Sequence, residues 1–258
     1  MRLGTTAGRQ SGRRAVLLLL LLTSVAPLPS AAAPLEEHVT GGVLDLPWLN
    51  GFGVSANMQP LTLAPGDPAL PNPSGDGTVG VATNSMAPDS GGVVLTAIDP
   101  GNVSDYSWEA WVFTGAGNTR RGLVVRADPA NQFQSCYQFV MQAGLLQFNF
   151  RKLVNSAPTT LATWFSNTFP GGQPLPNTWH HMRVVAIGSE FRCYWDGNQI
   201  TQTPIVDASL PTGWAGVYSF RFDLGGVPFY VDDLMLEDIT ATPTRRASWG
   251  QVKEIYTR

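Results

Sequence analysis

Hydrophobic and polar residues alternate with a period of two through residues 106–197, and this alternation dominates the middle of the chain. The alternating runs are short, and glycine, asparagine, proline or aspartate separates them. They read DYSWEAWVF, GLVVRAD, CYQFVMQ, LLQFNFRKL, WHHMRVVAIG and EFRCYWDGN. Short alternating runs bounded by turn-forming residues are typical of antiparallel strands with one buried face. The pattern therefore predicts an all-β domain.

The same alternation assigns side chains to faces. In the first run Trp108, Ala110 and Val112 share the parity of a buried face, which turns Glu109 and Trp111 to the other side. Every later run divides in the same way. We therefore expect one set of side chains to form a core and the other set to form a surface.

The segments on either side have weaker patterns. Residues 34–86 hold short apolar pieces around the turn-rich run GDPALPNPSGDG, which predicts edge strands and a long loop. Strands are predicted at 91–99 and 229–239, and residues 155–178 read as a loop with one short strand. One domain over residues 34–240 accounts for all of these elements.

The tail, residues 241–258, has a helical pattern. Ser248 and Gln251 have the spacing of a capping box, and Trp249, Val252 and Tyr256 recur at helical intervals. We expect one short C-terminal helix after the last strand.

Residues 1–33 have the features of a secretory signal peptide. Four arginines precede the apolar run from Ala15 to Val25, and three alanines ending at Ala33 supply a cleavage site. The alternative is a membrane anchor, but the apolar run is far shorter than the roughly 20 residues that span a bilayer. We expect cleavage after Ala33, a secreted protein that is extracellular or periplasmic, and no membrane span.

Charge narrows the class of partner. The chain carries 16 Lys+Arg and 19 Asp+Glu, and loss of the four signal-peptide arginines changes its net charge from −3 to −7. A thinly charged, net-acidic protein is poorly suited to nucleic acid or anionic membranes. Neutral partners such as polysaccharides remain compatible with this charge.

The two cysteines, Cys136 and Cys193, suggest a disulfide in an exported chain. Strand parity argues against it, because Cys193 falls on the core face of its run and Cys136 on the opposite face. A β-bulge would be needed to bring the two sulfur atoms together.

Taken together, the motifs resemble the concanavalin A-like jelly roll, in its laminin-G-like branch of exported bacterial proteins. The resemblance covers roughly residues 90–239 and rests on the order of several elements. These are WEAWVF, GLVVRADPANQ, CYQFVMQAGLLQFNFRKLVNSAPTTLA, TWHHMRVVAIGSEFRCYWDGNQI, SLPTGWAGVY and YVDDLMLED. It implies a sandwich of two antiparallel sheets that binds carbohydrate or protein, and in some branches hydrolyses glycosides. Fold alone does not choose between these functions.

Glycoside hydrolysis needs two carboxylates about 5–10 Å apart. The hydrolytic relatives carry E-x-D-x-x-E on one strand, and this sequence does not. Its nearest acidic cluster includes Asp232, which shares parity with Leu234 and Leu236 and should point inward. We expect Asp232 to accept backbone N–H groups from a neighbouring loop, and we expect no enzymatic activity.

Metal binding has one candidate site. Many jelly rolls of this type hold calcium at the rim, and Asp128 and Asn131 in RADPANQ could supply oxygen ligands. The alternative is an Asx-type turn in which both side chains bind backbone groups. His180 and His181 are adjacent on a strand, face opposite ways and cannot chelate one ion together. No cofactor other than calcium is suggested.

Sugar binding needs an exposed aromatic ring beside polar side chains. The residues that parity places off the core face are Glu109, Trp111, Arg126, Gln138, Arg183 and Tyr194. If their strands are neighbours, these residues form one aromatic and basic surface; otherwise they are ordinary solvent-facing residues, with Trp111 packed under residues 155–178. We therefore predict a secreted, non-catalytic binding module for carbohydrate. The alternatives are a structural or adhesive component that binds a cell-surface protein, and a glycoside-processing enzyme.

Overall fold

A computed structural model of the chain describes residues 34–53, 57–83, 90–96, 104–113, 119–142, 147–170, 172, 174–221 and 229–239. Contacts divide the chain into residues 1–30 and 31–258, and all described residues belong to the second unit. The predicted signal peptide and the predicted C-terminal helix lie outside the described residues.

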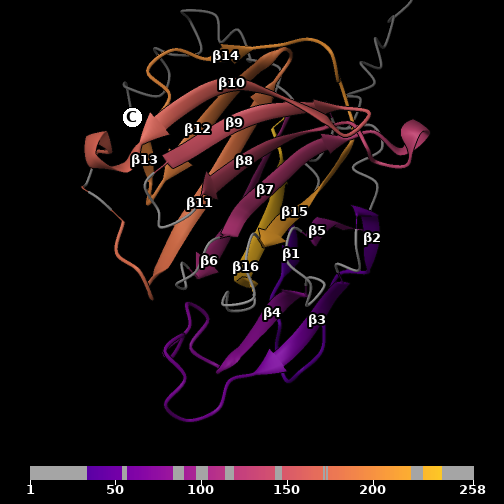
Figure 1. Cartoon of the computed structure of the whole chain (residues 1–258). Coiled ribbons are helices and arrows are strands. Elements are labelled where there is room, and N and C mark those ends of the chain that lie inside the picture. Colours follow the sequence, from indigo (N-terminus) through magenta and orange to yellow (C-terminus); the bar gives the residue numbers. More distant parts are fainter. Residues whose placement is uncertain are drawn as a thin grey trace, which may run out of the picture. The chain divides into compact units, whose positions relative to one another are not determined.

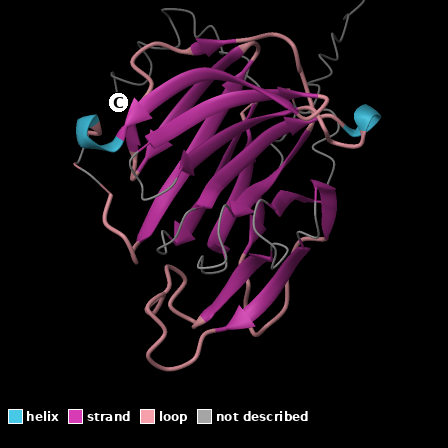
Figure 2. Cartoon of the chain, viewed as in Figure 1, coloured by secondary structure: helices cyan, strands magenta, loops and turns pink. Residues whose placement is uncertain are grey.

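The described residues form two antiparallel sheets, so the predicted all-β sandwich is confirmed (Figures 1 and 2). Sheet A runs in the order β13 (Asn198–Gln199), β12 (Glu190–Trp195), β11 (Trp179–Ile187), β6 (Tyr106–Phe113), β16 (Phe229–Asp238), β4 (Thr78–Thr83) and β3 (Asn57–Thr62). Two short strands join this sheet: β1 (Leu35–Glu37) pairs with β16, and β14 (Ile205–Val206) pairs with β12.

Sheet B packs on sheet A. Its order is β10 (Ala157–Phe165), β9 (Gln147–Val154), β8 (Cys136–Gln142), β7 (Thr119–Ala127), β15 (Trp214–Arg221), β5 (Ser90–Thr96) and β2 (Trp48–Gly53). The helical elements among the described residues are two 3-10 turns, η1 (Pro129–Asn131) and η2 (Ser166–Thr168). No helix in this part of the chain has the length and apolar character of a membrane span.

The main core lies between the sheets and follows the predicted parity. Trp108, Ala110 and Val112 of β6 are fully buried there, facing side chains such as Tyr137 and Phe139 of β8. The Trp108 indole also donates a 2.7 Å hydrogen bond to the Gly216 carbonyl of β15. Since β6 belongs to sheet A and β15 to sheet B, this bond joins the two layers inside the core.

Both cysteines are buried and unpaired, as parity suggested. Cys193 belongs to the core between the sheets, whereas Cys136 packs on the outer face of sheet B with Val124 and Val140. Desolvation raises the pKa of Cys136 to about 12, so this thiol is held in its neutral form.

Candidate functional site

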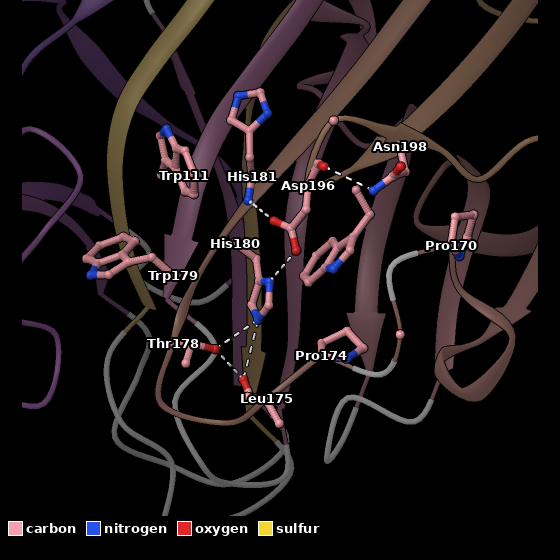
Figure 3. A pocket seen from close by; sticks show the side chains of 13 residues that line it. Trp111, Pro170, Pro174, Leu175, Thr178, Trp179, His180, His181, Asp196 and Asn198 are labelled. Carbon is pink, nitrogen blue, oxygen red and sulfur yellow. Dashed lines mark hydrogen bonds and ion pairs between the residues drawn. The ribbon is translucent and has the colours of Figure 1, made fainter.

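A cavity of about 690 Å³ opens at one end of sheet A, where β11 begins and β12 ends (Figure 3). Trp111 of β6 contributes to its wall, as do Pro174 and Leu175 from the loop that precedes β11. Its volume falls within the roughly 300–1,000 Å³ typical of small-molecule sites. We call it the first cavity.

The turn after β12 brings the polar side chains of the first cavity together. Trp195 pairs with Asn198, which leaves a two-residue loop of Asp196 and Gly197. Their φ angles are 47° and 75°, as a type I′ hairpin requires, and Asp-Gly is a preferred sequence for this turn. The turn fixes the Asp196 carboxylate at the rim.

Asp196 accepts hydrogen bonds from both adjacent histidines of β11. Its Oδ1 atom accepts the His181 backbone N–H at 2.9 Å, and its Oδ2 atom lies 2.6 Å from Nδ1 of His180. The His180 ring also stacks on Trp195, with ring centroids 4.7 Å apart. These contacts orient the His180 ring in the cavity wall.

The set Thr178, His180 and Asp196 has the order of a nucleophile–base–acid relay. The Thr178 hydroxyl lies 2.9 Å from Nε2 of His180 and is also hydrogen-bonded to the Leu175 carbonyl. Its single hydrogen can point to either acceptor, so these contacts hold the loop and the ring in place without fixing a direction of proton transfer.

Trp111 and His181 form the aromatic part of the first cavity. They are cross-strand partners on β6 and β11, and their ring centroids are 5.2 Å apart. Burial lowers the pKa of His181 from its usual value, although Glu109 at 3.7 Å opposes this effect. A neutral imidazole offers one donor and one acceptor, which suits the hydroxyl groups of a ligand.

The comparisons with known proteins identify the family. Residues 88–244, more than half of the chain, match the model of the concanavalin A-like lectin/glucanases superfamily. The chain belongs to this superfamily. No match was found among curated protein sequences.

Several solved structures resemble the chain. The carbohydrate-binding module CBM66 from Bacillus subtilis has a TM-score of 0.52 and 17% identity, covering 75% of this chain and 97% of its own. Domain 4 of the extracellular arabinanase AbnA from Geobacillus stearothermophilus has a TM-score of 0.42 and 14% identity. The match covers 74% of this chain and 82% of that domain's chain. The Ca²⁺-bound exoplasmic/lumenal domain of VIP36 has a TM-score of 0.48 and 12% identity. The match covers 75% of this chain and 90% of the VIP36 chain. At 17% identity the likeness to CBM66 shows the fold alone.

In this concanavalin A-like chain, four predicted ligand residues lie on the outer face of sheet A. They are Glu109, Trp111, Arg183 and Tyr194, on the neighbouring strands β6, β11 and β12. Trp111 alone among them lines the first cavity. Arg183 forms an ion pair with Glu109 at 3.2 Å and covers the Tyr194 ring at 5.6 Å. Three of the four are therefore engaged with one another beside the cavity.

The other two predicted residues, Arg126 and Gln138, lie on sheet B, so the single surface expected from parity does not form. Pairing of β7 with β15 shifts register here, and Arg126 has a φ of 52°. This bulge turns Arg126 inward, 4.9 Å from the Phe191 ring of the core. Gln138 is fully buried and accepts a 2.7 Å hydrogen bond from Arg151.

The predicted calcium ligands form the alternative, an Asx-type turn. Asp128 Oδ1 accepts the Ala130 N–H at 2.8 Å and caps η1, while Asn131 Oδ1 accepts the Ser135 N–H at 3.2 Å. Where the structure describes the chain, no cluster of three or more His, Cys, Asp or Glu side chains could hold a metal. Asp128 and Asn131 use these oxygen atoms within the turn, and calcium binding stays a prediction.

Sequence reasoning missed most of the first cavity. It identified Trp111, considered His180 and His181 only as chelators of one ion, and named no residue of the turn at 196–197 as a site candidate. Antiparallel pairing of the two consecutive strands could have revealed the site. In such a pair the turn that follows β12 must lie beside the start of β11. That pairing places Asp196 next to both histidines.

Proposed function

We propose that this protein is a non-catalytic carbohydrate-binding module and that the first cavity is its binding site. The observation that carries the proposal is the pairing of half-buried Trp111 and His181 at the wall of a cavity with polar groups at its rim. An aromatic face can pack on the apolar side of a sugar ring while polar groups bind its hydroxyls. The sandwich shared with CBM66, a carbohydrate-binding module by name, supports the choice of ligand class.

The charges of the first cavity favour a neutral sugar. Its described lining residues include no lysine or arginine, so an acidic sugar would have no cationic side chain to pair with. Asp196 is the one carboxylate among them, whereas glycoside cleavage uses two. Binding without cleavage is therefore the function that this lining supports best. With the predicted signal peptide at residues 1–33, we place this binding outside the cytoplasm.

Glycan-array and calorimetric binding test the proposal. Trp111→Ala should weaken binding of neutral glycans at least tenfold, or about 1.4 kcal/mol, because it removes the aromatic face. Trp214→Ala is the matched control: Trp214 is also half-buried, but it packs against Phe133 and lines neither described cavity. Glycan binding that is absent, or equal in the wild type and Trp111→Ala, would overturn the proposal. Release of shortened sugars from the bound glycan would overturn its non-catalytic part.

A further inference from the structure

A second cavity of about 660 Å³ lies beside the first. It opens between β10, the edge strand of sheet B, and the segment from β13 to β14 at the edge of sheet A. Pro170 lines both cavities, so they adjoin at this residue. Along the hairpin, Asn198 lines the first cavity and its neighbour Gln199 lines the second.

The second cavity has an apolar wall and an uncharged polar rim. Trp164 is half-buried and packs edge-on against Phe139, with ring centroids 6.1 Å apart and 86° between the planes. Gln202 and Thr203, from the segment between β13 and β14, also line the cavity and are exposed. In the part of the chain that the structure describes, neither side chain has a protein hydrogen-bond partner, so both can bind a ligand.

The described lining of this second cavity contains no charged side chain at all. Amide and hydroxyl groups beside an indole suit a ligand that is rich in hydroxyls and carries no charge. A neutral saccharide has this chemistry. Each cavity has the volume of one small-molecule site, so a ligand that fills both must be longer than one that fills the first alone.

We propose that the two cavities form one continuous groove that binds an extended stretch of a neutral oligosaccharide chain. The proposal rests on the carbohydrate function proposed above and adds ligand length and class to it. In this groove Trp111 binds one part of the oligosaccharide, which then passes Pro170. Trp164, Gln202 and Thr203 bind the next part.

Calorimetry with ladders of neutral glucan, xylan, mannan, arabinan and fructan oligosaccharides tests the groove. For the ladder that binds, affinity should rise as the ligand grows long enough to pass Pro170. The combined variant Gln202→Ala and Thr203→Val changes two exposed side chains, so the fold should persist. It should lose about tenfold in affinity for long ligands by removing two hydrogen bonds, and leave disaccharide binding unchanged.

The two proposals fail in different ways. If disaccharides bind through Trp111 but affinity does not rise with length, or the double variant retains the rise, the groove is overturned and the carbohydrate site stands. If no ladder binds, both are overturned. A second cavity that takes a peptide segment, as shown by competition with peptides but not with sugars, also overturns the groove.

Discussion

Nδ1 of His180 lies 2.6 Å from Oδ2 of Asp196, across the end of the β11–β12 pair. The same carboxylate accepts the backbone N–H of His181 at 2.9 Å. One turn residue thus holds two adjacent residues of β11 at the first cavity. The His180 ring stacks on Trp195, and the His181 ring lies beside Trp111. These contacts are local. Asp196 therefore matters more for the shape of the first cavity than for the stability of the whole fold.

Removal of the Asp196 carboxylate should therefore affect binding before stability. We expect Asp196→Ala to weaken glycan binding about tenfold through loss of two hydrogen bonds that orient the wall. The thermal midpoint should change little, because the carboxylate is substantially exposed. Glu190→Ala, which removes an exposed carboxylate paired with Arg192, should change neither. Equal affinities for Asp196→Ala and the wild type would contradict this account of the wall.

His181 predicts how stability depends on pH on the acid side. Burial lowers the pKa of His181 in the folded state, so below the unfolded value of 6.5 the unfolded chain takes up this proton more readily. The contribution of His181 to the free energy of unfolding should therefore fall as the pH drops below 6.5. Urea unfolding of wild type and His181→Gln over this range measures it. The wild type should lose more stability than the variant, and parallel curves would refute the prediction.

His38 predicts the opposite dependence on the alkaline side. Hydrogen bonds to Asp233 at 3.0 Å and to Glu36 at 2.9 Å raise the pKa of His38 to about 9, although burial opposes them. Its stabilising effect should be complete below pH 6.5 and disappear as the pH rises through about 9. The effect should be small, because the His38 side chain is 47% exposed and solvent screens the charges.

Thermal midpoints of wild type and His38→Gln across this range test the prediction. The difference between the two proteins should be largest near pH 6 and should vanish above about pH 9. A difference that is constant with pH would show that the His38 ring stabilises the fold through packing rather than through its charge.

Local alternation made the core predictable. Trp108, Ala110 and Val112 face inward as expected, and Cys136 and Cys193 point in different directions. The rule failed at Arg126, because a bulge with a φ of 52° interrupts the period of two. A one-residue bulge leaves little trace in an alternating sequence, so this reversal could not be read in advance.

The site was less predictable because it depends on which strands are neighbours. Trp111 and His181 are 70 positions apart in the sequence but are paired across β6 and β11. Alternation gives the face of each residue, not the order of strands in a sheet. Gln138 had the expected outward parity on β8, yet β8 lies in the other sheet.

The last prediction concerns Asp232, because a variant at this position distinguishes a structural role of the carboxylate from a catalytic one. Its side chain is fully buried, and Oδ2 accepts hydrogen bonds from the Asn72 side chain at 2.9 Å and the Ser74 backbone at 3.0 Å. The predicted structural role is confirmed: the carboxylate anchors a loop to β16. Burial and the nearby Asp233 charge raise the pKa of Asp232, but no sugar can reach a group without exposed surface.

We therefore expect Asp232→Ala to lower the free energy of unfolding by about 2–3 kcal/mol, because it leaves buried donors without an acceptor. Asp233→Asn is the control, since Asp233 has a φ of 44° that asparagine tolerates, and it should cost less. Glycan affinity of folded Asp232→Ala should equal that of the wild type, because Asp232 lines neither described cavity. A variant that stays fully stable but loses a sugar-processing activity would instead make Asp232 a catalytic residue.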